Sequence, residues 1–275
     1  MYLRFCAHRP WCVNDPTVRF NSVQAGDIID GWEAHGERKM SARRFGYVVC
    51  IVCWAAAPVH AAVEEPVDLT SGKISGVALE SGVQVFRGIP FAAPPVGDLR
   101  WKAPEPPIPW GGVLPADAFG PACMQRRGNR LMSEDCLYLN VWTNAEDAQA
   151  GLPVMVWIHG GGWSSGASNG RVYDGEAFAA NGVVLVSVNY RMNGFGFMAH
   201  PALSAESEHG VSGNYAILDH VAALEWVRDN IAGFGGDPSN VTIFGESAGG
   251  ASVYALLATP RAKGLFHRAI AQSTW

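Results

Sequence analysis

Ser247 is the residue whose type and neighbours most directly suggest chemistry. It is the centre of Gly245-Glu246-Ser247-Ala248-Gly249, between an apolar run, Val241 to Phe244, and a stretch of small residues, Ala248 to Ala258. A strand, a sharp turn and a helix are expected here, with the serine at the turn, which is the nucleophile-elbow pattern. The flanking glycines fit, because so tight and strained a turn leaves no room for side chains near the serine. The alternative is an ordinary Gly-Ser loop.

A glycine run forms the second motif. His159-Gly160-Gly161-Gly162-Trp163 follows the apolar run Val154 to Ile158. Acyl transfer builds negative charge on a carbonyl oxygen, and each backbone N–H aimed at that oxygen is worth about 3 kcal/mol. Upstream of a G-x-S-x-G sequence, an HGGG element is the expected oxyanion loop of lipases and esterases. A loop rich in glycine for steric reasons alone is the alternative.

Longer strings extend this pattern. On them the chain resembles the type B carboxylesterases, the group that includes the cholinesterases, from about Val67 to Ser273. Asn144 departs from the family, which usually has proline there. The resemblance implies an α/β-hydrolase fold and a serine ester hydrolase that uses no cofactor. The matching strings are Phe86-Arg87-Gly88-Ile89-Pro90-Phe91, Pro94-Pro95-Val96-Gly97-Asp98-Leu99-Arg100-Trp101, Glu134-Asp135-Cys136-Leu137-Tyr138-Leu139-Asn140-Val141-Trp142, Asn189-Tyr190-Arg191 and Phe234-Gly235-Gly236-Asp237-Pro238.

Roles for the other site residues follow. In this fold the N–H of the residue after the nucleophile donates to the oxyanion, which gives that role to Ala248. The resemblance implies that Gly161 and Gly162 supply two further donors, and that Glu246 borders the site and shapes its field. His159 precedes Ser247 and belongs to the glycine motif, so it is interpreted as a loop-positioning residue rather than a base.

Two cysteines follow residue 61, Cys123 and Cys136. In an exported chain such a pair suggests a disulfide, and the resemblance implies the same pair; two free thiols are the alternative. The loop between them contains no tryptophan. In cholinesterases this loop carries the aromatic ring that holds the choline cation, so an uncharged ester is the expected substrate.

The residues that would activate Ser247 are missing from the expected place. Triads of this fold run serine, acid, histidine along the chain, yet the 28 residues after Ser247 contain no Asp or Glu and one histidine, His267. Family members are roughly twice this length. The sequence therefore predicts the N-terminal half of an esterase, with only residual catalysis by itself. The alternative is a non-catalytic cholinesterase-like remnant or interaction module.

The N-terminal region has a different composition. Met40 to Arg44 is basic, Phe45 to Pro58 is apolar, and Val59-His60-Ala61 resembles a cleavage site. Residues 40–61 are therefore predicted to be a signal peptide for secretion or export to the periplasm, too short to anchor the protein stably in a membrane. Residues 1–39 are interpreted as an extension from a mis-called start, and 62–275 as the partial esterase domain.

The overall composition restricts the kinds of partner that the chain could bind. The chain is 48% hydrophobic and 16% charged, with a formal net charge of −5, as in a soluble globular protein. It has no basic stripe, which argues against nucleic acid. Its histidines lack ligand spacing, so no metal site is predicted.

The elements that must position these residues can be placed from apolar patterns. Strands are expected at Leu137–Trp142, Val154–Ile158, Val183–Val188 and Val241–Phe244, the last three buried on both faces. Apolar residues spaced by four and three predict a helix from Tyr215 to Ile231, ending at Gly233. Small antiparallel hairpins are expected between Val67 and Phe86. Together these predict the first half of a mostly parallel, doubly wound sheet with its site at the strands' carboxyl ends.

Overall fold

The computed structural model describes residues 62–126 and 131–274. The predicted extension at 1–39 and the predicted signal peptide at 40–61 lie outside the described residues. Within the described part of the chain, no helix is long and apolar enough to cross a membrane.

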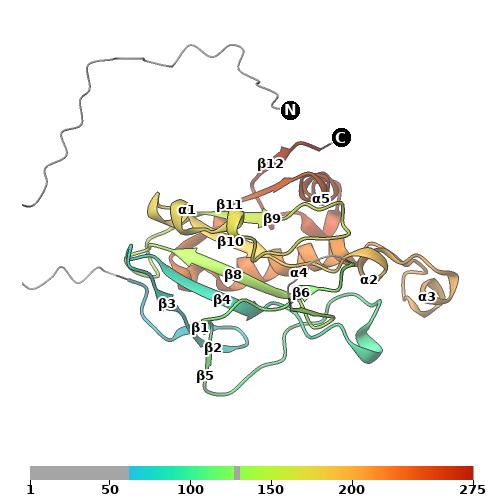
Figure 1. The fold of residues 1–275 in the computed structure, drawn as a ribbon, viewed down its shortest axis with the longest axis horizontal. Helices are drawn as coiled ribbons and strands as arrows, with labels where there is room; N and C mark the ends of the chain where they lie inside the picture. Colours follow the sequence, from blue (N-terminus) through green and yellow to red (C-terminus); the bar gives the residue numbers. More distant parts are fainter. Residues whose placement is uncertain (1–61, 127–130, 275) are drawn as a thin grey trace, which may run out of the picture. The chain divides into compact units, whose positions relative to one another are not determined.

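A seven-stranded sheet forms the centre of the fold, in the order β12-β11-β9-β10-β8-β4-β3 (Figure 1). β9, β10, β11 and β12 run parallel, whereas β10–β8, β8–β4 and β4–β3 pair antiparallel. The prediction of a parallel sheet thus holds for the strands around the candidate site, and the sheet as a whole is mixed. The bounds are β3 Val77–Ala78, β4 Gln84–Pro90, β8 Tyr138–Thr143, β9 Leu152–Ile158, β10 Val184–Val188, β11 Gly236–Glu246 and β12 Arg268–Gln272.

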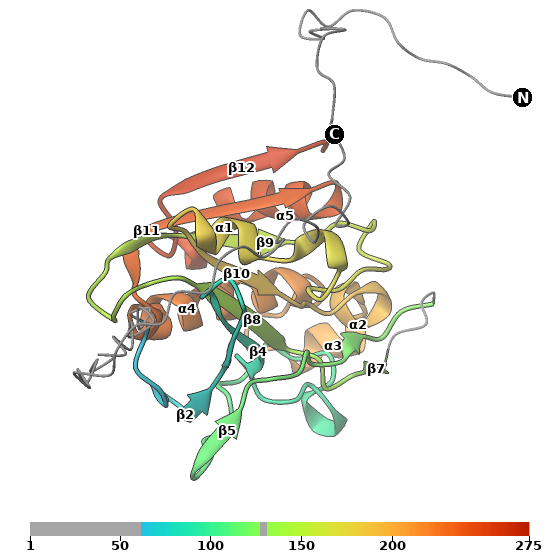
Figure 2. The same cartoon turned by 60° about the vertical axis from the view of Figure 1, so that its left-hand side comes forward.

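The sheet separates two apolar cores, because successive side chains of a strand point to opposite faces. Val184, Val186 and Val188 of β10 join a core that also contains Val221 and Leu224 of helix α4, whereas Leu185 belongs to the other core. That second core contains Ala179 of helix α1. Helices α4 (Tyr215–Asn230) and α5 (Ala248–Leu257) therefore cover one face and α1 (Glu176–Ala180) the other, as Figures 1 and 2 show. This is the expected doubly wound arrangement.

Smaller elements surround the sheet. β1 (Val67–Leu69) and β2 (Gly72–Ser75) form an antiparallel hairpin that β5 (Val113–Pro115) extends in parallel, and β3–β4 forms a second hairpin, so the predicted hairpins are present. Among the described residues the others are β6 Ala122–Cys123, β7 Met132–Ser133, α2 Asn193–Phe197, α3 Pro201–Glu206 and the short 3-10 turns η1 Gly97–Leu99, η2 Arg171–Tyr173, η3 Ile231–Phe234 and η4 Pro260–Ala262.

α4 ends at Asn230, one residue before the predicted Ile231, and the 3-10 turn η3 follows it directly. The chain passes Gly233 in the 3-10 turn η3 and stops at Gly235, whose φ of 75° is left-handed. Only a residue without a Cβ adopts this conformation at little cost. Gly235, rather than the predicted Gly233, therefore ends the helical stretch formed by α4 and η3 and directs the chain into β11.

Candidate active site

Ser247 lies at the sharp turn between β11 and α5, as the pattern predicted. Its φ of 56° and ψ of −122° are strained for a residue with a side chain. Its N–H donates to the Gln272 carbonyl of the neighbouring β12 at 2.9 Å, and its carbonyl accepts from Ala251 N–H at 3.0 Å. The backbone is thus held on both sides of the serine, whose side chain remains half-buried at the carboxyl end of β11.

Steric crowding requires glycine on both sides of the elbow, at positions 245 and 249. A Cβ on Gly245 would lie 2.5 Å from the Gly249 carbonyl carbon, and one on Gly249 would overlap the Ile158 carbonyl oxygen at the end of β9. These distances are shorter than real Cβ contacts. The first turn of α5 therefore packs directly against β9, and the glycine loop that follows β9 begins beside Ser247.

The glycine loop approaches the nucleophile closely. Gly160 is buried, and a Cβ on it would lie 2.6 Å from the Glu246 carbonyl oxygen and 3.1 Å from Ser247 Cβ. Gly161 and Gly162 follow with φ of 110° and 63° and are exposed. The fold thus brings the two sequence motifs together, although 85 residues separate Gly162 from Ser247.

Two carbonyl hydrogen bonds fix the orientation of the loop's peptide groups. The Gly160 carbonyl accepts from His159 Nδ1 at 2.8 Å, and the Gly161 carbonyl accepts from the N–H groups of Ser164 and Ser165 at 3.1 Å each. In a trans peptide the N–H points opposite to the carbonyl of the same unit. The Gly161 N–H is therefore directed away from the His159 ring, and the Gly162 N–H away from the Ser164–Ser165 turn.

His159 has the surroundings of a positioning residue. It is 1% exposed, and because a carbonyl can only accept, its Nδ1 must carry the proton that bonds Gly160. Its ring stacks on Tyr190, with centroids 4.3 Å apart, and the Tyr190 hydroxyl donates to the His159 carbonyl at 2.8 Å. Burial raises the pKa of Tyr190 well above its usual value, so this phenol stays a donor. Tyr190 has no role predicted from the sequence, where its place in the string Asn189-Tyr190-Arg191 is the only signal.

Ala248 and Glu246 flank the serine differently. Ala248 is buried and is the first residue of α5, and the first N–H groups of a helix have no acceptor within the helix. Its N–H is therefore suited to bind an anion. Glu246 is exposed, and its carboxylate lies beside Gly160: a Cβ on that glycine would be 2.9 Å from Glu246 Oε2.

Trp163 continues the glycine loop toward α5. It is half-buried with a φ of 53°, and its indole N–H donates to Ser252 Oγ at 3.0 Å. Its ring packs against Phe197 of α2, with centroids 5.5 Å apart. These contacts tie the far end of the loop to the helix that starts at the nucleophile.

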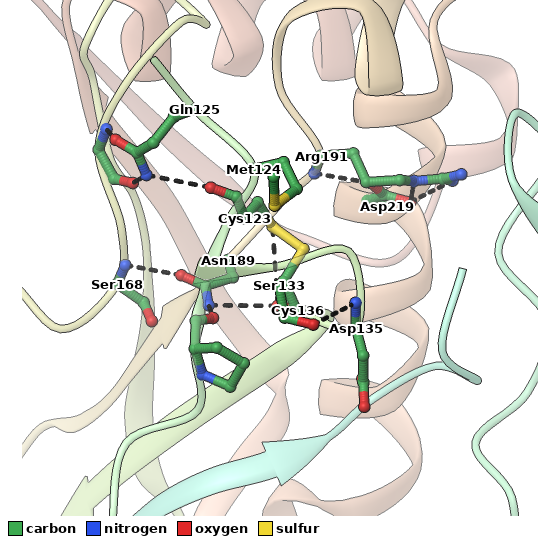
Figure 3. Close-up of a disulfide and its surroundings, with 12 residues drawn as sticks. Cys123, Met124, Gln125, Ser133, Asp135, Cys136, Ser168, Asn189, Arg191 and Asp219 are labelled. Atoms are coloured by element: carbon green, nitrogen blue, oxygen red, sulfur yellow. Dashed lines mark hydrogen bonds and ion pairs between the residues drawn. A yellow bond between two sulfur atoms is a disulfide. The ribbon is translucent and has the colours of Figure 1, made fainter. Parts of the chain in front are cut away.

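Cys123 and Cys136 form a disulfide, which confirms the predicted pair (Figure 3). Both cysteines are buried, and the Cα–Cα distance is 5.0 Å. Beside this bond lies Gln125, whose side-chain amide donates to the Gly166 carbonyl at 2.8 Å and accepts from the Gly166 N–H at 3.0 Å. Sequence reasoning had no signal for Gln125, because its partner is a backbone group 41 residues away.

His267 lies away from the elbow. Its backbone N–H donates to the Val241 carbonyl, and its Nδ1 accepts from Val241 N–H at 3.1 Å. Val241 precedes Ser247 by six residues of extended chain. The imidazole thus lies beside the middle of β11, roughly 20 Å along the strand from the serine at ~3.3 Å per residue. In the part of the chain that the structure describes, no group of three or more His, Cys, Asp or Glu could hold a metal ion.

These features define an α/β-hydrolase: a sheet with helices on both faces, a serine elbow after β11 and a glycine loop after the neighbouring β9. A solved structure of the Geobacillus stearothermophilus carboxylesterase EST55 at pH 6.2 matches with a TM-score of 0.70 and 51% identity, over 74% of this chain and 42% of that one. A PNB esterase structure matches with a TM-score of 0.70 and 48% identity, over 78% of this chain and 44% of that one.

The chain belongs to the carboxylesterase family, whose sequence model matches residues 63–275. It is 50% identical to the fumonisin B1 esterase of Sphingopyxis macrogoltabida, over 79% of this chain and 42% of that protein. It is 51% identical to the para-nitrobenzyl esterase of Bacillus subtilis (strain 168), over 74% and 42% respectively. The chain thus spans about two fifths of the length of these relatives.

Proposed function

We propose that the whole protein carrying this chain hydrolyses carboxylic esters through Ser247. The observation that carries the proposal is the close approach of the glycine loop to the strained serine. A Cβ on Gly160 would lie 2.6 Å from the Glu246 carbonyl oxygen and 3.1 Å from Ser247 Cβ. In this mechanism Ser247 Oγ attacks the ester carbonyl and the alcohol departs, leaving an acyl-enzyme. Water then releases the carboxylic acid and restores the serine.

The N–H groups of Gly161, Gly162 and Ala248 are proposed to bind the oxyanion. The Gly160 carbonyl accepts from His159 Nδ1, and the Gly161 carbonyl accepts from the Ser164–Ser165 turn. The N–H groups of the same two peptide units therefore point away from these partners. Ala248 adds the first N–H of α5, which has no acceptor within the helix. Prearranged donors of this kind stabilise the transition state at little reorganisation cost.

The base and acid are proposed to come from outside this chain. His159 is buried with Nδ1 bonded to Gly160, and His267 contacts Val241, roughly 20 Å along β11 from Ser247 at ~3.3 Å per residue. Neither is suited to take the proton from Ser247. The 275-residue chain by itself is therefore expected to show only the weak catalysis that an oxyanion hole and binding provide.

The proposed substrate is a small uncharged ester. The Cys123–Cys136 loop contains no tryptophan that could hold a quaternary ammonium group. The names of the relatives are consistent with non-choline esters, since they are esterases of fumonisin B1 and of para-nitrobenzyl compounds. The disulfide also supports, as a proposal, export of the protein by the 40–61 signal.

The test compares whole-protein variants on a neutral p-nitrophenyl ester and with a fluorophosphonate, which labels activated serines. Ser247→Ala is expected to abolish labelling and lower kcat by at least about a thousandfold, because it removes the nucleophile. Ser239→Ala, an exposed serine at the start of β11, is the matched control and should behave as wild type. A folded wild-type protein that neither reacts nor hydrolyses the ester would favour the non-catalytic interaction module.

A further inference from the structure

The side chain of Gln125 pairs with a backbone peptide as a neighbouring strand would. Its Oε1 accepts from Gly166 N–H at 3.0 Å, and its Nε2 donates to the Gly166 carbonyl at 2.8 Å. Nε2 also donates to the Cys123 carbonyl at 3.1 Å. One amide thus joins the disulfide to the segment that closes the glycine loop.

Gly166 packs against the beginning of the same loop. With a φ of 121°, it lies so close that a Cβ would overlap His159 Nδ1 and lie 2.6 Å from the Gly160 carbonyl oxygen. These two atoms form the hydrogen bond that directs the Gly161 N–H. A shift of Gly166 would therefore displace the peptide group whose N–H is proposed to bind the oxyanion.

A second amide repeats the connection from the other cysteine (Figure 3). Asn189 Nδ2 donates to the Cys136 carbonyl at 3.2 Å, and Asn189 Oδ1 accepts from Ser168 N–H at 2.8 Å. The carbonyls of Cys123 and Cys136 thus anchor two amides that hold residues 166 and 168. The disulfide fixes the positions of these two carbonyls relative to each other.

We propose that Gln125 is a positioning residue for the oxyanion loop, acting through Gly166, with the Cys123–Cys136 disulfide as its fixed support. The inference rests on the proposed esterase function for its kinetic consequence. Its structural part, the holding of the loop, stands without any activity. Gln125 itself has no contact with the substrate in this proposal.

The test uses three variants of the whole protein. Gln125→Ala removes the amide, Gln125→Glu keeps its size but removes the donor to Gly166, and Gln149→Ala, at an exposed glutamine, is the matched control. Hydrogen exchange of peptides covering residues 159–168 reports the loop, and kcat and KM on the neutral ester report the site.

Both Gln125 variants are expected to exchange the loop amides about tenfold faster, which corresponds to the loss of one or two net hydrogen bonds. Exchange in the core strands should stay unchanged. The kcat should fall by about tenfold to a hundredfold with KM nearly constant, because a displaced donor affects the transition state more than substrate binding. Gln149→Ala should match wild type in both measurements.

Three results would overturn the proposal: unchanged loop exchange in both variants, a rise in KM with kcat preserved, or loss of cooperative unfolding in both variants, which would assign Gln125 to general stability. If the wild-type protein hydrolyses no ester, the esterase proposal fails separately. Loop exchange then decides alone whether Gln125 holds the loop.

Discussion

His220 is a fully buried histidine that the proposed reaction does not use. It lies on α4, and its ring makes an edge-type contact with the Tyr190 ring, with centroids 4.5 Å apart. Tyr190 also stacks on His159. Neither ring nitrogen has a hydrogen-bond partner in the described part of the chain. Burial, with a smaller contribution from nearby His159, lowers the pKa of His220 from 6.5 to about 3.

This burial predicts acid sensitivity. Between pH 6.5 and about 3 the unfolded chain binds a proton at His220 that the folded chain excludes, so the free energy of unfolding decreases as the pH falls through this window. The slope is about 1.4 kcal/mol per pH unit, and the loss by pH 4 is about 3 kcal/mol. His220→Gln, which cannot titrate, should lose less stability between pH 7 and pH 4 in urea unfolding of the whole protein. His209→Gln, at an exposed site, is the control; equal losses in wild type and His220→Gln would contradict the prediction.

At the scale of the elements, a buried ion pair joins the end of β10 to α4. Arg191 Nη2 lies 2.7 Å from Asp219 Oδ1, with side-chain exposures of 4% and 0%. Asp219 also accepts from the Arg191 backbone N–H at 2.9 Å, and Arg191 Nη1 donates to the Lys102 carbonyl at 2.9 Å. The pair thereby fixes the chain just after Tyr190, the residue that supports the oxyanion loop.

Breaking this pair should cost more than replacing it. Asp219→Leu leaves Arg191 buried without its carboxylate and is expected to lower the free energy of unfolding by about 3–5 kcal/mol. The double variant Arg191→Met with Asp219→Leu should recover part of that loss, because no uncompensated charge remains. Urea unfolding of the whole protein measures both, and a single variant within about 1 kcal/mol of wild type would show that the pair is not important for stability.

The elements differ in how well the sequence predicts them. β9, β10, β11 and α4 have continuous or periodic apolar residues, so packing and local pattern agree and the predictions lie within a few residues. β11 starts five residues before its predicted start because Gly236 pairs with Leu152 across an irregularity in the ladder. The short helices α2 and α3 have too few residues for a periodic signal.

The same distinction applies within the candidate site. Ser247 and the glycine run are contiguous motifs whose backbone demands can be read locally. Gln125 and Tyr190 act on carbonyl and amide groups far away in the chain, and only the folded arrangement determines which backbone group a side chain reaches.

At the scale of the whole molecule, β12 is the most exposed part of the sheet. Among the described residues it pairs with β11 alone, and Figure 2 shows it at the edge of the sheet. Ile270 on this strand is 44% exposed, and Tyr254 and Leu257 on the adjoining α5 are also exposed. An apolar strand with an unpaired edge is a template for association between chains.

The 275-residue chain expressed alone is therefore expected to aggregate. Ile270→Lys should increase its soluble fraction, because a charge on an edge strand opposes pairing with another copy. Ile108→Lys makes the same change at an exposed position outside the strands and should help less. Centrifugation and light scattering compare the three proteins. A soluble wild-type monomer with a sharp thermal transition would contradict the prediction.

The crowded elbow also restricts how the gene can vary. Gly245, Gly249 and Gly160 each face backbone atoms at distances that exclude a Cβ, whereas Gly111 has open space around it. Every single-nucleotide change that replaces a glycine, unlike a synonymous third-base change, introduces a side chain or a stop. Every non-synonymous change at the three crowded codons therefore disrupts the turn, while Gly111 has space for alanine or serine. Mutations that replace Gly245, Gly249 or Gly160 are therefore expected to be lost because they disrupt the fold, whatever reaction the site performs.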